Sequence, residues 1–222
     1  MNSEYNTVYI PEGYGKIRFS RVEIKHILIG VAALTLAFTI VLNQDLATAL
    51  KQSYNATLPL TLGVAAFVVL AGFLLHELGH KFVAQRYGAW AEFRMYPMGL
   101  VLAVMMSFFG FLFAAPGAVY IAGRVTKRQN GLISLAGPIV NLTIGGIFLA
   151  AWLIFPHGAT GMVLNLIAVM SLFLAGFNLI PIPPLDGYKI ATWNIPVYLA
   201  IVAGTGVCLM LGWGMIEIAG LG

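Results

Sequence analysis

Charged side chains are scarce in this sequence. Asp, Glu, Lys and Arg together make up only 9% of the 222 residues, whereas hydrophobic residues make up 60%. An ordinary soluble domain carries roughly 25% charged residues. Several apolar runs also approach or exceed the roughly 18 residues that cross a bilayer. The composition therefore excludes a typical soluble domain and predicts an integral membrane protein.

Cysteine is almost absent as well. The single cysteine, Cys208, lies within an apolar run. It has no second thiol with which to form a disulfide, and a thiolate zinc site needs several cysteines. The sequence thus excludes a disulfide-stapled domain and a cysteine-ligated metal site.

Acidic residues are fewer than basic ones, eight against twelve, which gives a formal net charge of +4. The basic residues lie in short clusters beside apolar runs, as charges next to membrane spans do. Nucleic acid is therefore not an expected partner. Residues 1–25 form a polar, aromatic arm that we expect to lie at the headgroups or to pack against the membrane domain, and residues 26–222 form that single domain.

Five long apolar segments predict helical spans. They lie at roughly 26–43, 58–84, 131–155, 160–180 and 195–219. The expected fold class is an all-α, multi-pass membrane protein with five to six transmembrane helices. Four basic residues precede the first span and Lys51 alone follows it, so the positive-inside rule predicts a cytoplasmic N-terminus in the cell membrane.

The segment 97–123 is apolar enough to cross once, but Gly110 and Pro116-Gly117 interrupt it. A single crossing would place Arg124, Lys127 and Arg128 outside, against the positive-inside rule. We therefore expect a re-entrant hairpin that returns to the cytoplasmic side, with two short helices as the alternative.

The stretch "HELGH" contains three titratable groups at membrane depth. On a helix, the i, i+4 spacing places His76 and His80 on one face, where both imidazoles reach one zinc ion, with Glu77 beside them as a general base. Ionisable groups within a membrane are expensive and normally bind an ion, pair or line a wet cavity. A metal site accounts for all three residues better than hydrogen bonding within a bundle.

Catalytic zinc usually has three protein ligands and one open position. Asp186 is the remaining candidate for the third ligand, since Asp45, Glu92, Glu217 and His157 lie in less suitable places. It follows closely spaced prolines in "NLIPIPPLDG" that break the preceding helix. The same residues also suit an ordinary helix-ending turn.

The sequence resembles the site-2 protease family of intramembrane zinc metalloproteases in three motifs: HELGH, "GPIVN" at 137–141 and "NLIPIPPLDG" at 178–187. The resemblance covers the core, about 58–190, and it implies a membrane-associated β segment near 97–123. It implies one zinc ion per chain, held by His76, His80 and Asp186, with Glu77 as the base. It also implies that Asn141 and Asn178 position the substrate or the active-site frame, although both asparagines equally suit hydrogen bonding between helices.

Chain topology gives a separate expectation. Because His76 and His80 lie near the cytoplasmic end of the second span, Asp186 can join them only after an even number of crossings. Two confident spans intervene, which again favours a re-entrant 97–123. The active site is then expected to open toward the cytoplasm.

The expected function is hydrolysis of peptide bonds within or near transmembrane segments of membrane-protein substrates. Zinc and Glu77 would activate water, and the segment 97–123 would offer a strand edge to an unwound substrate. One alternative is a non-catalytic membrane protein that binds substrate segments or moves zinc, although such a protein has no need of Glu77. Another is a membrane-anchored zinc protease that acts on soluble substrates.

Overall fold

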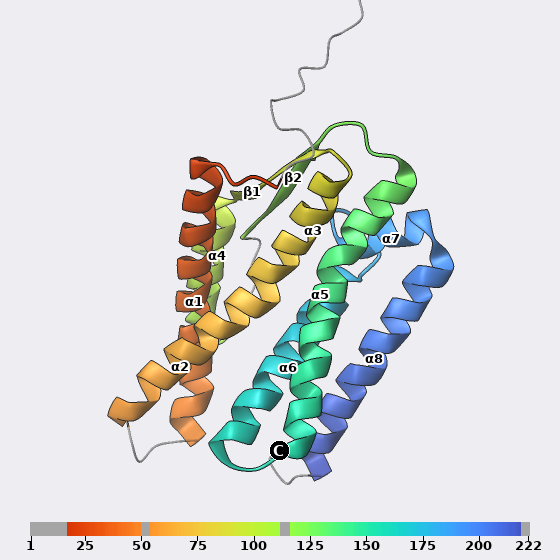
Figure 1. Ribbon diagram of the computed structural model, residues 1–222. Helices are drawn as coiled ribbons and strands as arrows, with labels where there is room; N and C mark the ends of the chain where they lie inside the picture. Colours follow the sequence, from red (N-terminus) through yellow and green to blue (C-terminus); the bar gives the residue numbers. More distant parts are fainter. Residues whose placement is uncertain (1–16, 50–53, 112–115, 219–222) are drawn as a thin grey trace, which may run out of the picture.

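The computed structural model describes residues 17–49, 54–111 and 116–218, with side chains over 17–43, 58–111 and 116–212. Five helical stretches in this part of the chain are long and apolar enough to cross a membrane: Arg21–Asn43, Leu58–Arg86, Lys127–Ile154, Gly158–Asn178 and Ile195–Gly212. All five spans predicted from the sequence are therefore confirmed, and the protein is a helical membrane protein with a small sheet at one end (Figure 1).

The first two spans are built from four elements. Helix α1 covers Arg21–Ala49, and the second span consists of α2 (Tyr54–Val68), a π-helical turn η1 (Val69–Leu74) and α3 (Leu75–Arg86). Such turns are frequent at functional sites. Here η1 ends at Leu74, two residues before His76, within an otherwise continuous apolar span.

The chain returns to the same end of the bundle between the second and third spans. Strand β1 (Trp90–Met95) pairs antiparallel with β2 (Gly117–Ala122), and Phe93 lies opposite Val119. Between them, α4 (Pro97–Ser107) has 11 residues, about 16 Å of helix, which is half of a hydrocarbon core. The predicted re-entrant β segment is confirmed at β2, and the alternative of two short helices is replaced by one helix and one strand.

The remaining helices form the other half of the bundle. They are α5 (Lys127–Ile154), α6 (Gly158–Asn178), α7 (Asp186–Trp193) and α8 (Ile195–Ile218). A capping box at Thr126 and Gln129 begins α5, which satisfies free N–H groups of its first turn. Figure 1 shows the short α7 at the end of the bundle that also holds the sheet.

The small sheet packs on α3 and α5 through one apolar face. Ala91 and Phe93 of β1 are buried, and Val119 and Ile121 of β2 pack against Ala84 and Ile133. This period of two, with Tyr120 pointing outward, is the pattern of a strand that is covered on one side. The packing places the sheet directly beside the HELGH helix.

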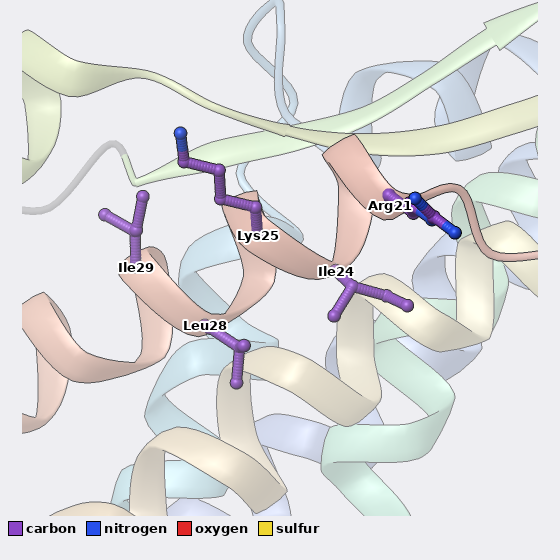
Figure 2. A pocket seen from close by; sticks show the side chains of 5 residues that line it. All are labelled: Arg21, Ile24, Lys25, Leu28 and Ile29. Atoms are coloured by element: carbon purple, nitrogen blue, oxygen red, sulfur yellow. The ribbon is translucent and has the colours of Figure 1, made fainter.

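The start of α1 also packs against this end of the bundle. A shallow hollow on the outer side of α1 is lined by Arg21, Ile24, Lys25, Leu28 and Ile29 (Figure 2). Two cations followed by apolar side chains match a helix that enters a membrane from the headgroup region. Glu23 points the other way and is completely buried, so the described end of the predicted arm packs against the membrane domain.

Candidate metal centre

The three predicted ligands come from two distant parts of the sequence and meet at the end of the bundle that holds the sheet. His76 and His80 come from α3, one turn apart, and Asp186 is the first residue of α7. One ligand atom from each lies within 4.8 Å of the other two. All three residues are at least nine-tenths buried. We call these residues the metal cluster.

The contacts within the metal cluster are short. His76 Nε2 lies 3.3 Å and His80 Nε2 3.0 Å from Asp186 Oδ2, and the two Nε2 atoms are 3.0 Å apart. Tetrahedral zinc with bonds of about 2.0–2.1 Å separates its ligands by about 3.3 Å. Two imidazole nitrogens and a carboxylate oxygen are also ligand types that zinc accepts. The residues present therefore fit a zinc ion.

Helix α5 lies behind the two histidines and leaves space for them. A Cβ atom on Gly137 would lie 2.5 Å from His80 Nε2 and 2.6 Å from His76 Nε2. Only a glycine therefore lets the helix backbone approach the cluster at this point. Four residues earlier, the carbonyl oxygen of Ile133 lies 2.7 Å from His80 Nδ1, so that ring donates to it and keeps Nε2 free for a metal.

Asp186 faces both imidazoles through its carboxylate. Burial alone would raise its pKa, but the neighbouring imidazoles of His80 and His76 outweigh burial and lower the pKa below its ordinary value. Lys189 Nζ lies 3.5 Å from the second oxygen, Oδ1. Oδ2 is thus the oxygen that faces the imidazoles.

Glu77 lies beside the cluster without belonging to it. Its carboxylate interacts electrostatically with His76, His80 and Asp186, and Oε2 accepts the backbone N–H of Val119 at 3.0 Å. The sheet therefore holds Glu77 from one side. A carboxylate beside the metal cluster, held by the hydrogen bond from Val119, is suitably placed to accept a proton.

The two predicted asparagines differ in position. Asn141, on α5, is completely buried, with Nδ2 3.2 Å from His76 Nδ1. Asn178, at the end of α6, donates to the carbonyl of Leu174 in its own helix. The structure therefore brings Asn141 to the metal cluster, whereas the hydrogen bond of Asn178 stays within α6.

The other residues considered as a third metal ligand are not part of the metal cluster as far as the structure describes them. Glu92 lies in β1 and contacts Arg94 and Ser20, and His157 is an exposed residue before α6. The side chains of Asp45 and Glu217 lie outside the described residues.

Sequence reasoning missed a second buried polar cluster, formed by Glu23 and Lys81, which we call the ion-pair cluster. Both side chains are completely buried. Lys81 donates to both carboxylate oxygens of Glu23, at 2.8 and 2.7 Å, and to the carbonyl of Ala91 at 2.9 Å. The only sequence signal for this cluster was that Lys81 directly follows His80, the second histidine of "HELGH".

Several known proteins are similar to this chain. "Putative zinc metalloprotease MJ0611" of Methanocaldococcus jannaschii is 40% identical over 188 residues, which cover 83% of this chain and 91% of that protein. "Zinc metalloprotease MJ0392" of the same organism is 31% identical, over 57% of this chain and 33% of its own length. "Putative zinc metalloprotease Rip2" of Mycolicibacterium smegmatis is 33% identical, over 59% and 58%. No family model and no solved structure matches the chain.

Proposed function

We infer that this chain, which belongs to the zinc metalloprotease family of the relatives above, is an intramembrane protease of the site-2 type. Its substrates are membrane proteins, cleaved within or near a transmembrane segment. The observation that carries this proposal is a buried cluster of two histidines and an aspartate, with Glu77 beside it, in a bundle whose long helices are apolar enough to cross a membrane. Such groups at membrane depth are retained for a purpose.

The mechanism assigns a task to each residue of the site. His76, His80 and Asp186 would hold one zinc ion, which when bound supplies Lewis acidity that polarises a carbonyl and activates water. Glu77 accepts a proton from the water that attacks the scissile carbonyl, and then donates that proton to the amine that leaves. The hydrogen bond from the Val119 N–H keeps the carboxylate in place between the two transfers.

The sheet offers one edge to an extended substrate. The N–H of Phe93 and the carbonyl of Ala91 are bound by Glu23 and Lys81, so the outer edge of β1 is closed. On β2, the Val119 N–H points away from β1 toward Glu77. We propose that the substrate unwinds and adds as a third strand along β2, since main-chain hydrogen bonds then hold it beside the base.

Strand addition is tested by removing one outward N–H from β2. Antiparallel residues alternate in their hydrogen bonding, so Ile121 points its N–H outward as Val119 does. Ile121→Pro should slow cleavage while leaving the zinc content unchanged, and Tyr120→Ala, which alters an outward side chain and no main-chain donor, is the control. Equal cleavage by Ile121→Pro and the unaltered protein would contradict the strand-addition proposal.

The opening of the site and the N-terminus are proposed to face the cytoplasm. The support is two groups of basic residues: Arg18, Arg21 and Lys25 at the start of the first span, and Arg124, Lys127 and Arg128 at the start of the third. A thiol reagent that cannot cross membranes should label Arg128→Cys in inside-out vesicles and not in right-side-out vesicles. The reverse labelling would overturn the orientation.

The function itself is tested with the purified chain in detergent and a panel of single-span substrates. We expect about one zinc ion per chain and cleavage that Glu77→Gln slows by roughly 10²–10⁴-fold, with zinc retained. A protein without zinc would refute the proposal. Bound zinc without cleavage of any substrate would instead favour the non-catalytic zinc-binding alternative.

A further inference from the structure

The two histidines of the metal cluster have different groups behind them. His80 Nδ1 faces the carbonyl oxygen of Ile133, which can only accept a hydrogen bond. The proton of a neutral His80 ring is therefore on Nδ1, and Nε2 keeps its lone pair for a metal. His76 Nδ1 faces the side-chain amide of Asn141, which can either donate or accept.

The amide of Asn141 has its nitrogen toward His76, with Nδ2 3.2 Å from Nδ1. In this orientation the amide donates, so the proton of a neutral His76 lies on Nε2, the atom that faces Asp186 Oδ2. A protonated Nε2 has no lone pair for a metal. At the same time, Oδ1 of the completely buried Asn141 has no hydrogen-bond partner.

We propose that Asn141 is the positioning residue of His76: with its amide turned by half a rotation, Oδ1 accepts Nδ1–H of His76 and leaves Nε2 free to bind the metal. The rotation exchanges two groups of nearly equal size, so it needs no movement of α5. In the turned orientation Oδ1 gains a partner that it now lacks. A bound metal, which needs the lone pair of His76 Nε2, favours that orientation.

The position of Asn141 on α5 supports this role. Ile133, Gly137 and Asn141 follow one another at intervals of four, so they line one face of the helix. His76 and His80 have the same interval on α3. The carbonyl of Ile133 supports one ring, the missing side chain of Gly137 admits both, and Asn141 supports the other. A partner that only filled space between helices would not need an oxygen at this place.

This inference rests on the proposed zinc site, and the test therefore measures zinc affinity and not cleavage. Full-length protein in detergent is titrated with zinc against a chelator for the unaltered chain, Asn141→Leu and Asn141→Asp. Loss of a partner behind a metal-binding histidine weakens metal affinity by about 10–100-fold, which we expect for Asn141→Leu. Asn141→Asp keeps an acceptor for Nδ1–H, so its affinity should stay within a few-fold of the unaltered chain.

Two outcomes would overturn the inference: unaltered affinity in Asn141→Leu, or an equal loss in Asn141→Asp and Asn141→Leu. If the unaltered chain binds no zinc, the proposed function fails first. ¹⁵N-histidine NMR provides a readout that needs no variant, since the chain has only four histidines. The His76 proton should move from Nε2 to Nδ1 when zinc is added, and a metal bound through Nδ1 would equally refute the proposal.

Discussion

Two buried polar clusters lie on neighbouring residues of α3 and differ in how their bonding capacity is used. In the ion-pair cluster, all three donors of the Lys81 ammonium have acceptors, two from Glu23 and one from Ala91. In the metal cluster, two imidazoles and a carboxylate turn ligand atoms toward one point. The first cluster is complete within the protein, whereas the second has ligand atoms that could hold a cation. This difference separates a structural polar cluster from a candidate binding site.

The clusters also differ in what they connect. The ion-pair cluster joins α1 and α3 to β1, because Glu23 also accepts the N–H of Phe93 at 2.9 Å. The metal cluster joins α3 to α7. Between the two clusters, the N–H of Val119 in β2 donates a hydrogen bond to Glu77. The ion-pair cluster thus holds the sheet in the position from which it contacts the base.

Removing a ligand should have the largest effect. Asp186→Ala leaves two imidazoles, and we expect zinc affinity to fall by more than the roughly 10–100-fold that follows loss of an outer partner, with cleavage lost as well. Zinc titration of the purified protein measures this. Glu77→Gln is the control, because it should keep its zinc. Full zinc binding by Asp186→Ala would remove Asp186 from the ligand set.

Breaking the ion-pair cluster should destabilise the fold. Lys81→Met leaves the Glu23 carboxylate buried and unpaired, and such a change costs about 3–5 kcal/mol. The double variant Glu23→Leu/Lys81→Met should recover part of this loss. It still leaves the Phe93 N–H without its partner, at a cost of about 1–3 kcal/mol. Denaturant unfolding in detergent measures both variants.

A matched control for the ion-pair cluster is zinc affinity. Because the Lys81 ammonium contacts Glu23 and Ala91, folded Lys81→Met should bind zinc nearly as well as the unaltered chain. If the single variant were as stable as the unaltered protein, or if the double variant were less stable than the single one, the ion-pair cluster would not have the structural role assigned to it.

A smaller effect is expected where α5 approaches the histidines. Gly137→Ala places a Cβ within 2.6 Å of both Nε2 atoms, and overpacking of this kind costs about 1–3 kcal/mol and should weaken zinc binding. Gly146→Ala on the same helix is the control. Its Cβ meets nothing within 4 Å, so it should be neutral or stabilising by about 0.5–1 kcal/mol. Equal zinc affinity in the two variants would mean that the close approach of Gly137 is unnecessary.

The smallest effect concerns the part-exposed pair between Glu92 and Arg94 in β1. Such pairs contribute about 0–1 kcal/mol because water screens them. Arg94→Ala should therefore change the free energy of unfolding by less than about 1 kcal/mol. A loss similar to that of Lys81→Met would show that burial does not explain the difference between the two ion pairs.

Much of this architecture could be predicted because hydropathy and helical spacing are local properties. Five apolar segments identified the spans, and the interval between His76 and His80 placed both rings on one face before any tertiary contact was considered. The return of 97–123 to its starting side followed from charge and from the need to bring Asp186 to the histidines. Strand β1 was not predicted, since "WAEFRM" is short and carries two charges.

Asn141 and Asn178 show where local information ends. Both are asparagines in motifs near the site, yet only Asn141 has its hydrogen bond to a cluster residue, because α5 crosses α3 at that depth. Lys81 shows the same limit, since its sequence neighbours are those of an ordinary charge at a membrane boundary. Its partner lies 58 residues away on another span.

The sequence by itself determined that the chain is a membrane protein, that "HELGH" presents two imidazoles on one helix face, and that Asp186 is available after a helix break. These follow from composition and from the 3.6-residue period, which act over a few neighbouring residues. The tertiary structure decided which buried charges are paired and which converge on a candidate metal site. That distinction depends on helices α1, α5 and α7, which reach α3 only through the packing of the whole bundle.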